Sequence, residues 1–256
     1  MEISLRNKIA IVTGSASGIG FATTRQFLAS GIEGVTVVDD SPDLASAMAT
    51  LRSEGGERIE IVAGDVSQAS THERMVEATL ARFGRIDVLL NNAAVSVVKA
   101  VHDHSPEEWD RVMDVNVKAV YLAAQLAIPV MIRQRTGVVL NTGSISGLVG
   151  IANQGAYAAS KGALHQMTRQ MAVEYAPYGI RVNAVALGTV DTQIVHRSAE
   201  QSPNPHSFLE DLRAAHPLGR IATAAEAAKF FTFLASDDAA FFTGAVLSLD
   251  GGYTAQ

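Results

Sequence analysis

Short apolar runs rich in β-branched residues alternate along the chain with longer stretches of helical periodicity. The runs carry few charges, which is typical of strands that are covered on both faces of a parallel sheet. The predicted strands are Ile9–Val12, Val35–Val38, Ile59–Val62, Val88–Leu90, Val138–Leu140, Val182–Val185 and Ala245–Leu249. The predicted helices lie near 19–30, 43–54, 69–83, 106–134, 155–176 and 224–235. This alternation predicts an α/β protein in which helices flank a doubly wound, seven-stranded parallel sheet.

The chain has no Pro- or Gly-rich linker and no internal repeat, so we expect a single domain over residues 1–256. One long stretch, 189–217, lacks clear periodicity and contains Ser202-Pro203-Asn204-Pro205 and His216-Pro217. Long irregular segments inside compact folds are usually functional loops. We therefore expect a substrate lid at about 189–217.

Composition narrows the choice of partners and compartment. Hydrophobic residues make up 48% and charged residues 18%, which suits a large buried core. A net charge of −6 gives no electrostatic reason to expect nucleic acid or an anionic membrane as a partner. The absence of cysteine excludes disulfides and thiolate chemistry. No secretory segment and no run of eighteen uncharged apolar residues is found, so we expect a cytoplasmic protein with no membrane span.

A glycine-rich stretch follows the first predicted strand. Glycines in such a turn let backbone N–H groups approach a pyrophosphate, which then lies at the positive end of the next helix. The alternative is a tight strand–helix turn without a ligand, and the position favours phosphate binding. The expected cofactor contacts in this loop are Gly14, Ser17, Gly18, Ile19 and Gly20.

An acidic residue, Asp39, ends the second predicted strand, nineteen residues after Gly20. A carboxylate there accepts hydrogen bonds from the adenosine ribose and repels a 2′-phosphate. No Arg or Lys occurs between Asp39 and Leu51 to offset that repulsion, so NAD is favoured over NADP. Asp40 is the alternative, but strand alternation aims the two side chains differently, and we favour Asp39.

Tyr157 and Lys161 are four residues apart, so they share one face of the predicted helix. An ammonium near a phenol favours the phenolate, and the pair is therefore a candidate proton-transfer group. To exchange a proton near neutral pH, Tyr157 needs a pKa well below the ordinary tyrosine value of about 10. We expect Lys161 and a positively charged nicotinamide ring to lower it.

These motifs and several others occur in the order found in the short-chain dehydrogenase/reductase family, which the chain resembles over nearly its whole length. The branch resembled is the compact one of about 250 residues. The matching stretches are Thr13 through Gly20, Asp65-Val66, Asn91-Asn92-Ala93-Ala94, Asp250-Gly251-Gly252-Tyr253 and the four positions Asn116, Ser144, Tyr157 and Lys161. The resemblance implies a single NAD-binding catalytic domain of Rossmann type.

The resemblance also implies catalytic roles. Tyr157 would be the general acid/base, and Lys161 would also bind the ribose hydroxyls. Ser144 would hydrogen-bond the substrate oxygen. Asn116 would hold a water that links Lys161 to solvent, with a polar helix residue bonded to backbone as the alternative.

Further cofactor contacts follow from the resemblance alone. Asp65 and Val66 would contact adenine, Asn92 and Ala93 end the fourth strand, and Gly188, Val190 and Thr192 would lie at the nicotinamide carboxamide. The chain departs from the family's usual Pro-Gly after the sixth strand, because Leu187 stands where proline is usual. The change removes a constraint on φ.

The reaction expected is hydride transfer between NAD(H) and a secondary alcohol or ketone. Expected substrate contacts are Ser146, Gln154 and Leu187, in a lining that leans apolar. A neutral substrate is favoured, while a sugar, a hydroxysteroid or a 3-oxoacyl thioester stays open. A non-catalytic nucleotide sensor and a sugar-nucleotide epimerase or dehydratase are less favoured.

No metal is expected. His102-Asp103-His104 has a ligand-like spacing but no third ligand, and a solvated loop is the favoured interpretation. The compact members of the family are commonly tetramers. The resemblance therefore implies a homotetramer built through the long helices and the last strand.

Overall fold

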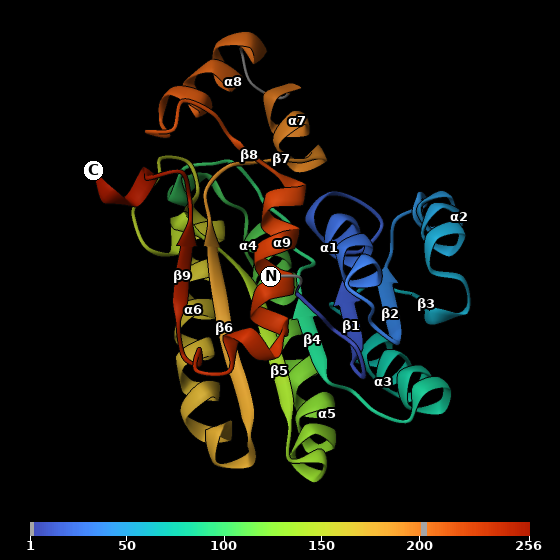
Figure 1. The fold of residues 1–256 in the computed structure, drawn as a ribbon. Helices are drawn as coiled ribbons and strands as arrows, with labels where there is room; N and C mark the ends of the chain where they lie inside the picture. The colour runs from blue at the N-terminus through green and yellow to red at the C-terminus, as the bar shows by residue number, and fades with distance from the viewer. Residues whose placement is uncertain (1–2, 201–203) are drawn as a thin grey trace.

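The computed structural model describes residues 3–200 and 204–256. A seven-stranded parallel sheet with the order β3-β2-β1-β4-β5-β6-β9 forms the centre of the molecule (Figure 1). Its strands are β1 Ile9–Thr13, β2 Gly34–Asp39, β3 Ile59–Ala63, β4 Val88–Asn91, β5 Gly137–Ser144, β6 Ile180–Leu187 and β9 Val246–Leu249. All seven predicted strands are confirmed, although β5 continues to Ser144, beyond its predicted end at Leu140.

Helices cover both faces of the sheet and divide its apolar side chains into two cores. One core holds Phe27 and Phe231, and the other holds Met75, Met131 and Met171. The first lies under α1 Gly18–Ala29, α2 Leu44–Gly55 and α9 Ala224–Ala235, and the second under α3 Ala69–Phe83, α5 Ala119–Gln134 and α6 Gly155–Tyr175. The doubly wound α/β architecture is therefore confirmed.

The predicted helix over 106–134 consists of α4 Pro106–Met113, a π-helical turn η3 at Asp114–Lys118, and α5. Ser105 and Glu108 start it with a capping box: Ser105 Oγ accepts from the Glu108 N–H at 3.2 Å, and a Glu108 carboxylate oxygen accepts from the Ser105 N–H at 3.0 Å. The wide turn was not predicted. It contains Asn116, one of the candidate catalytic residues.

Residues 106–134 also form the one described helix that is long and apolar enough to cross a membrane. Of its most apolar window, 56% is buried inside the protein. The α5 part carries Ala123, Ala127 and Met131 into the second core. Its apolar character is therefore explained by packing against the sheet.

The segment 189–217 is not irregular, contrary to expectation. It holds β7 Val190–Asp191, α7 Gln193–Glu200 and α8 Pro205–Ala214, and β7 pairs with β8 Ala222–Thr223 just beyond it. The helices were missed because they are short, and α8 depends on a local cap in which the Asn204 side chain accepts from the Ser207 N–H at 3.3 Å. Ser202 and Pro203 lie outside the described residues. In Figure 1, α7 and α8 stand beyond the end of the sheet to which the β9 arrow points.

The strand order reverses between β1 and β4, because β1 pairs with β2 on one side and with β4 on the other. In open parallel sheets ligands bind at such a switch point, outside the carboxyl ends of the strands. Thr13, Asp39, Asn91, Ser144 and Leu187 all end strands at this edge. The fold thus gathers the residues predicted from separate parts of the sequence.

Candidate active site

The glycine loop after β1 has the form of an anion cradle. Gly14 and Gly18 have φ of +67° and +54°, which disfavour a side chain, and a Cβ at Gly20 would overlap the Gly14 carbonyl. Ser17 is the N-cap of α1 but makes no side-chain cap bond. The first amides of α1 have no intrahelical acceptor, so the helix end fits a pyrophosphate.

The Asp39 carboxylate lies directly beside this loop. Its two oxygens accept hydrogen bonds from the N–H groups of Ala16 at 2.8 Å and Ser41 at 2.9 Å. Each oxygen keeps a further lone pair for another donor. Asp40 is exposed. Of the two neighbouring acids, Asp39 is the one that borders the glycine loop.

The end of β4 holds the glycine loop in place. Asn92 Nδ2 donates to the carbonyl groups of Thr13 and Gly14, both at 3.0 Å. In return Thr13 Oγ1 accepts from the N–H groups of Asn92 at 3.0 Å and Ala93 at 3.1 Å. Asn92 and Ala93 therefore support the glycine loop, and their expected contact with a cofactor stays a prediction. The sequence placed Thr13 at the start of the matching stretch Thr13 through Gly20, but no role was predicted for its hydroxyl.

The turn after β3 is tied down at two points. Asp65 accepts from the Ser67 N–H at 2.8 Å and from Arg111 Nη1 at 2.8 Å. His72 is buried, and its Nε2 lies 2.6 Å from the Val66 carbonyl, to which it donates. Burial lowers the pKa of His72, which keeps the ring neutral.

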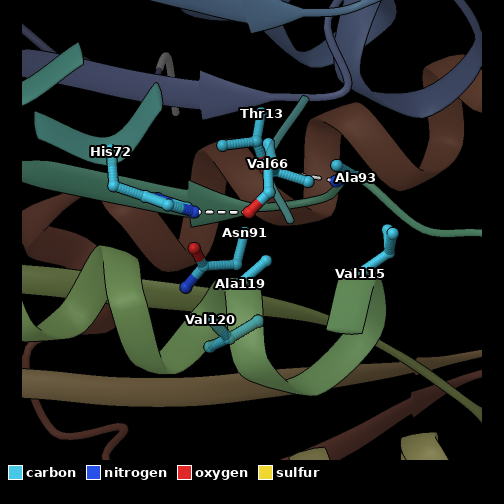
Figure 2. A pocket seen from close by; sticks show the side chains of 8 residues that line it. All are labelled: Thr13, Val66, His72, Asn91, Ala93, Val115, Ala119 and Val120. Carbon is cyan, nitrogen blue, oxygen red and sulfur yellow. Dashed lines mark hydrogen bonds between the residues drawn. The ribbon is translucent and has the colours of Figure 1, made fainter. Parts of the chain in front are cut away.

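Figure 2 shows His72 and Val66 among the side chains that line a small cavity. Its volume is about 10 Å³. That volume holds at most about one water molecule. The cavity is therefore a packing space between β4, α3 and α5, not the place for a dinucleotide. Its lining residues are Thr13, Val66, His72, Asn91, Ala93, Val115, Ala119 and Val120.

Lys161 is buried on α6, and its Nζ lies 5.4 Å from the centre of the Tyr157 ring. The ammonium donates to the Thr142 carbonyl on β5 at 2.7 Å. Burial in this apolar surrounding lowers the pKa of Lys161 to about 8. The predicted sharing of one helix face by tyrosine and lysine is confirmed.

The pKa of Tyr157 is raised in the protein chain by itself. Burial raises it above the ordinary value, and a hydrogen bond with Ser144 lowers it by less. In the protein chain by itself, desolvation of the phenolate outweighs the local hydrogen bond. The expected depression included a positively charged nicotinamide ring, and it stays a prediction for the complete site. The resting side chain is a protonated phenol.

Ser144 ends β5 and begins a chain of side-chain hydrogen bonds. Its Oγ accepts from the Ser146 N–H at 3.2 Å and lies 3.1 Å from Ser146 Oγ. The Ser146 hydroxyl bonds Gln154 Oε1, which only accepts, so Ser146 is the donor. Leu187 lies beside Ser144 in the β5–β6 register. Of the three residues expected at the substrate, Ser146 and Leu187 are therefore neighbours of Ser144, and Gln154 is linked to it through Ser146.

Asn116 in η3 is almost fully buried, and its side-chain amide is occupied by protein groups. Oδ1 accepts from the Val95 N–H, and Nδ2 donates to the Val95 carbonyl, both at 2.9 Å. Nδ2 also lies 3.0 Å from Ser160 Oγ, which donates to the Tyr157 carbonyl at 2.7 Å. The side chain thus has the backbone bonds of the alternative interpretation, and it links Asn116 to the helical turn that carries Tyr157. The water-holding role of Asn116 stays a prediction.

Residues 188–192 run from the end of β6 toward the glycine loop. Val190 is buried, and a Cβ at Gly18 would lie 3.3 Å from Thr192 Cγ2. Gly188 is needed because a Cβ there would come within 2.8 Å of His216 Nε2. Sequence reasoning missed His216, whose only visible signal was its place beside Pro217 in the 189–217 segment.

Among residues 3–200 and 204–256 no group of three His, Cys, Asp or Glu side chains could hold a metal ion. His102 and Asp103 are exposed and lie 3.5 Å apart. His104 turns away from them and accepts from the Ala156 N–H at 3.3 Å, at the start of α6. The loop therefore supports the helix that carries Tyr157.

Comparison with known proteins gives consistent matches over the whole chain. The profile of the family described as enoyl-(acyl carrier protein) reductase matches residues 14–254. The chain is 36% identical to 2-(S)-hydroxypropyl-CoM dehydrogenase 3 of Xanthobacter autotrophicus, with 100% of both chains covered. It is 37% identical to cyclopentanol dehydrogenase of Comamonas testosteroni, over 98% of this chain and 99% of that one.

A solved structure, L-sorbose reductase from Gluconobacter frateurii complexed with NADPH and L-sorbose, is similar throughout. It matches with a TM-score of 0.93 and 27% identity, and 100% of each chain is covered.

Proposed function

The chain belongs to the short-chain dehydrogenase/reductase family, and from this membership and the site we propose that it is an NAD-dependent dehydrogenase that interconverts a secondary alcohol and a ketone, with Tyr157 as general acid/base. Its relatives make it an oxidoreductase acting on CH–OH or C=O groups. The observation that carries the proposal is the meeting of Tyr157, Ser144 and Lys161 at the carboxyl end of β5. Only β4 lies between this end and the end of β1, where the loop that fits a pyrophosphate begins.

The residues divide the work as follows. A bound nicotinamide cofactor supplies or accepts the hydride at the carbinol carbon. In reduction the Tyr157 hydroxyl gives its proton to the substrate oxygen, and in oxidation the phenolate takes that proton back. Ser144 donates a hydrogen bond to the same oxygen and fixes its distance from Tyr157. Glycine-loop amides and Asp39 hold the cofactor's pyrophosphate and ribose.

Lys161 provides the positive charge that the phenolate requires. Without a cofactor, burial favours the protonated phenol, which is the form needed for ketone reduction. Alcohol oxidation needs the phenolate, so a second positive charge has to come from the oxidised nicotinamide. We therefore propose that oxidation gains more than reduction as pH rises toward about 8, because above that value Lys161 loses the charge that the phenolate requires.

The preference for NAD rests on Asp39. Its carboxylate borders the glycine loop and would repel a 2′-phosphate. The sorbose reductase complexed with NADPH is only 27% identical to this chain. The preference of this chain for NAD or NADP is therefore decided by experiment.

Replacing Asp39 by Ala tests this choice, because it removes the repulsion together with the ribose acceptor. We expect the ratio of kcat/KM for NAD to that for NADP to fall by about tenfold or more. Asp40→Ala is the matched control. An unchanged ratio in Asp39→Ala, or an equal fall in the control, contradicts the role of Asp39.

We propose a neutral secondary alcohol or ketone as substrate. Ser146 and Gln154 supply polar groups beside Ser144, and Leu187 supplies apolar surface. The relatives named for hydroxypropyl-CoM and cyclopentanol act on alcohols that differ widely in size. They therefore support oxidation of a secondary alcohol as the reaction class, but no single substrate for this chain. A sugar, a hydroxysteroid or a 3-oxoacyl thioester is the alternative.

Three features of the whole protein belong to the same proposal. The 189–217 segment acts as a lid over the substrate, and the protein is cytoplasmic. It assembles as a homotetramer, which would cover exposed apolar residues such as Val173 and Phe241. A solution mass of four 27.0 kDa chains is the expected result for the assembly.

The catalytic assignment is tested with Tyr157→Phe. Absorbance of reduced cofactor is followed with a panel of secondary alcohols and ketones, and NADH binding is measured separately by its fluorescence. We expect turnover to fall by a factor of about 10³ or more while the dissociation constant for NADH changes little. Near wild-type turnover in the variant would refute the assignment, and a wild-type protein that binds NADH without turnover would favour a nucleotide sensor.

A further inference from the structure

His216 occupies a buried junction of three chain segments. It follows α8, at the carboxyl-terminal end of the 189–217 segment, and only 3% of its surface is exposed. The turn after β6 lies on one side of the ring. The turn after β9 lies on another, where Tyr253 packs at 5.3 Å between ring centres.

Both ring nitrogens of His216 have backbone partners, which fix its chemical form. Nε2 lies 3.1 Å from the Thr189 backbone N–H, which can only donate, so Nε2 is unprotonated. Nδ1 lies 2.7 Å from the Leu212 carbonyl, which can only accept, so Nδ1 carries the proton. The ring is therefore a neutral Nδ1–H tautomer that joins Thr189 to Leu212.

The His216 ring fits against the turn after β6 because Gly188 has no side chain there. A Cβ on Gly188 would approach His216 Nε2 to 2.8 Å and the Cα of Asp250 to 2.9 Å. The Asp250 carboxylate is held by the N–H groups of Gly252 at 3.0 Å and Thr254 at 2.9 Å. The ring therefore sits against a turn that is itself fixed.

We propose that His216 is a positioning residue that fastens the far end of the 189–217 segment to Thr189, and so holds residues 188–192 in the conformation that receives the nicotinamide. This inference rests on the proposed function, because it assumes that residues 188–192 meet the cofactor. The two hydrogen bonds of the His216 ring join Thr189, at the start of the 189–217 segment, to Leu212, near its end. Loss of the Nε2 bond would release Thr189 and residues 188–192, whereas loss of the Nδ1 bond would release the end of α8 at Leu212.

The two bonds can be separated by substitution. Glutamine places its side-chain oxygen near the position of Nε2, so His216→Gln keeps an acceptor for the Thr189 N–H. Asparagine places its amide near Nδ1, so His216→Asn keeps a donor for the Leu212 carbonyl and leaves Thr189 unpaired. His216→Leu fills similar space and keeps neither bond.

The first measurement is the dissociation constant for NADH, taken from its fluorescence. We expect His216→Gln to stay within about threefold of wild type, and His216→Asn and His216→Leu to bind about tenfold more weakly. The second is amide hydrogen exchange at Thr189 without cofactor, expected to quicken in the Asn and Leu variants but not in the Gln variant. If the Leu variant fails to fold, the Gln and Asn pair carries the test.

A purely structural role for the ring predicts a different result. It would lower the melting temperature of the Gln and Asn variants alike, with no difference between them in NADH affinity or in Thr189 exchange. That outcome overturns the proposal. If wild-type protein binds no NADH, the proposed function fails instead, and the exchange rate at Thr189 still decides whether His216 holds this segment.

Discussion

Lys161 is a buried cation whose position is explained by function better than by stability. Its Nζ donates to the Thr142 carbonyl, and among the described residues no carboxylate forms an ion pair with it. Removing an ammonium from water without an opposite charge is costly, which is why its pKa falls to about 8. The protein therefore keeps a destabilising residue one helical turn from Tyr157, the proposed general acid/base.

The first prediction follows from that cost. The unfolded pKa is about 10.5 and the folded one about 8, so below pH 8 the lysine is charged in both states and the full penalty applies. The penalty corresponds to on the order of 3 kcal/mol. We expect Lys161→Met to raise the free energy of unfolding of the cofactor-free protein at pH 7 by about 1–3 kcal/mol while it abolishes turnover.

The sign of the pH dependence provides the check. Between pH 8 and 10.5 the unfolded state binds more protons than the folded state, so wild-type stability gains on the variant as pH rises. Urea unfolding at pH 7 and pH 9.5 should show the gap shrinking. Lys118→Met, at an exposed position, is the control and should show no such change. A gap that stays constant with pH would show that burial does not set the cost.

At the scale of elements, the glycine loop is held from β4 by one hydroxyl and one amide. Thr13 Oγ1 accepts from two backbone N–H groups, those of Asn92 and Ala93. Thr13 is itself buried, and its hydroxyl is the side-chain acceptor for both amides. The conformation of the loop therefore depends on a residue that precedes its first glycine, Gly14.

Thr13→Val should expose this dependence. Valine has nearly the shape of threonine but leaves both amides without a partner, and we expect the free energy of unfolding to fall by about 2–4 kcal/mol. NADH affinity should fall with it. Thr13→Ser keeps the hydroxyl and should stay within about 1 kcal/mol of wild type. Equal stability of the two variants in urea unfolding would contradict the prediction.

The elements also show where sequence patterns succeed. Long periodic stretches predicted α1, α3, α6 and the 106–134 helix closely, since many residues contribute to each pattern. The π-helical turn at Asp114–Lys118 was missed because its hydrogen-bond register leaves no mark on apolar spacing. The α7 and α8 helices were missed because eight and ten residues give too short a period.

At the scale of the whole molecule, parallel strands explain how much of the site was predictable. Asp39, Ser144 and the glycine loop each follow a strand, and the strand ends share one edge of the sheet. Their convergence therefore follows from topology. The hydrogen-bond chain through Ser146 and Gln154 and the upward direction of the Tyr157 pKa depend on side-chain packing, which no spacing encodes.

His216 belongs to the same class of unpredictable features. Its partners Thr189 and Gly188 come from one part of the chain, and Tyr253 comes from another. No periodic pattern relates these positions. Only the folded molecule shows that they meet.

The 189–217 segment lies largely outside both cores. Among its described residues Val190 joins a core cluster, and α8 contributes none. Substitutions along α7 and α8 should therefore change little of the folding free energy, whereas substitutions in β5 or β6 would change much of it. Under the proposed lid role, substitutions in α7 and α8 would change which substrate is bound while the sheet that carries Ser144 stays stable. Related proteins with this architecture would therefore differ in substrate specificity before they differ in fold.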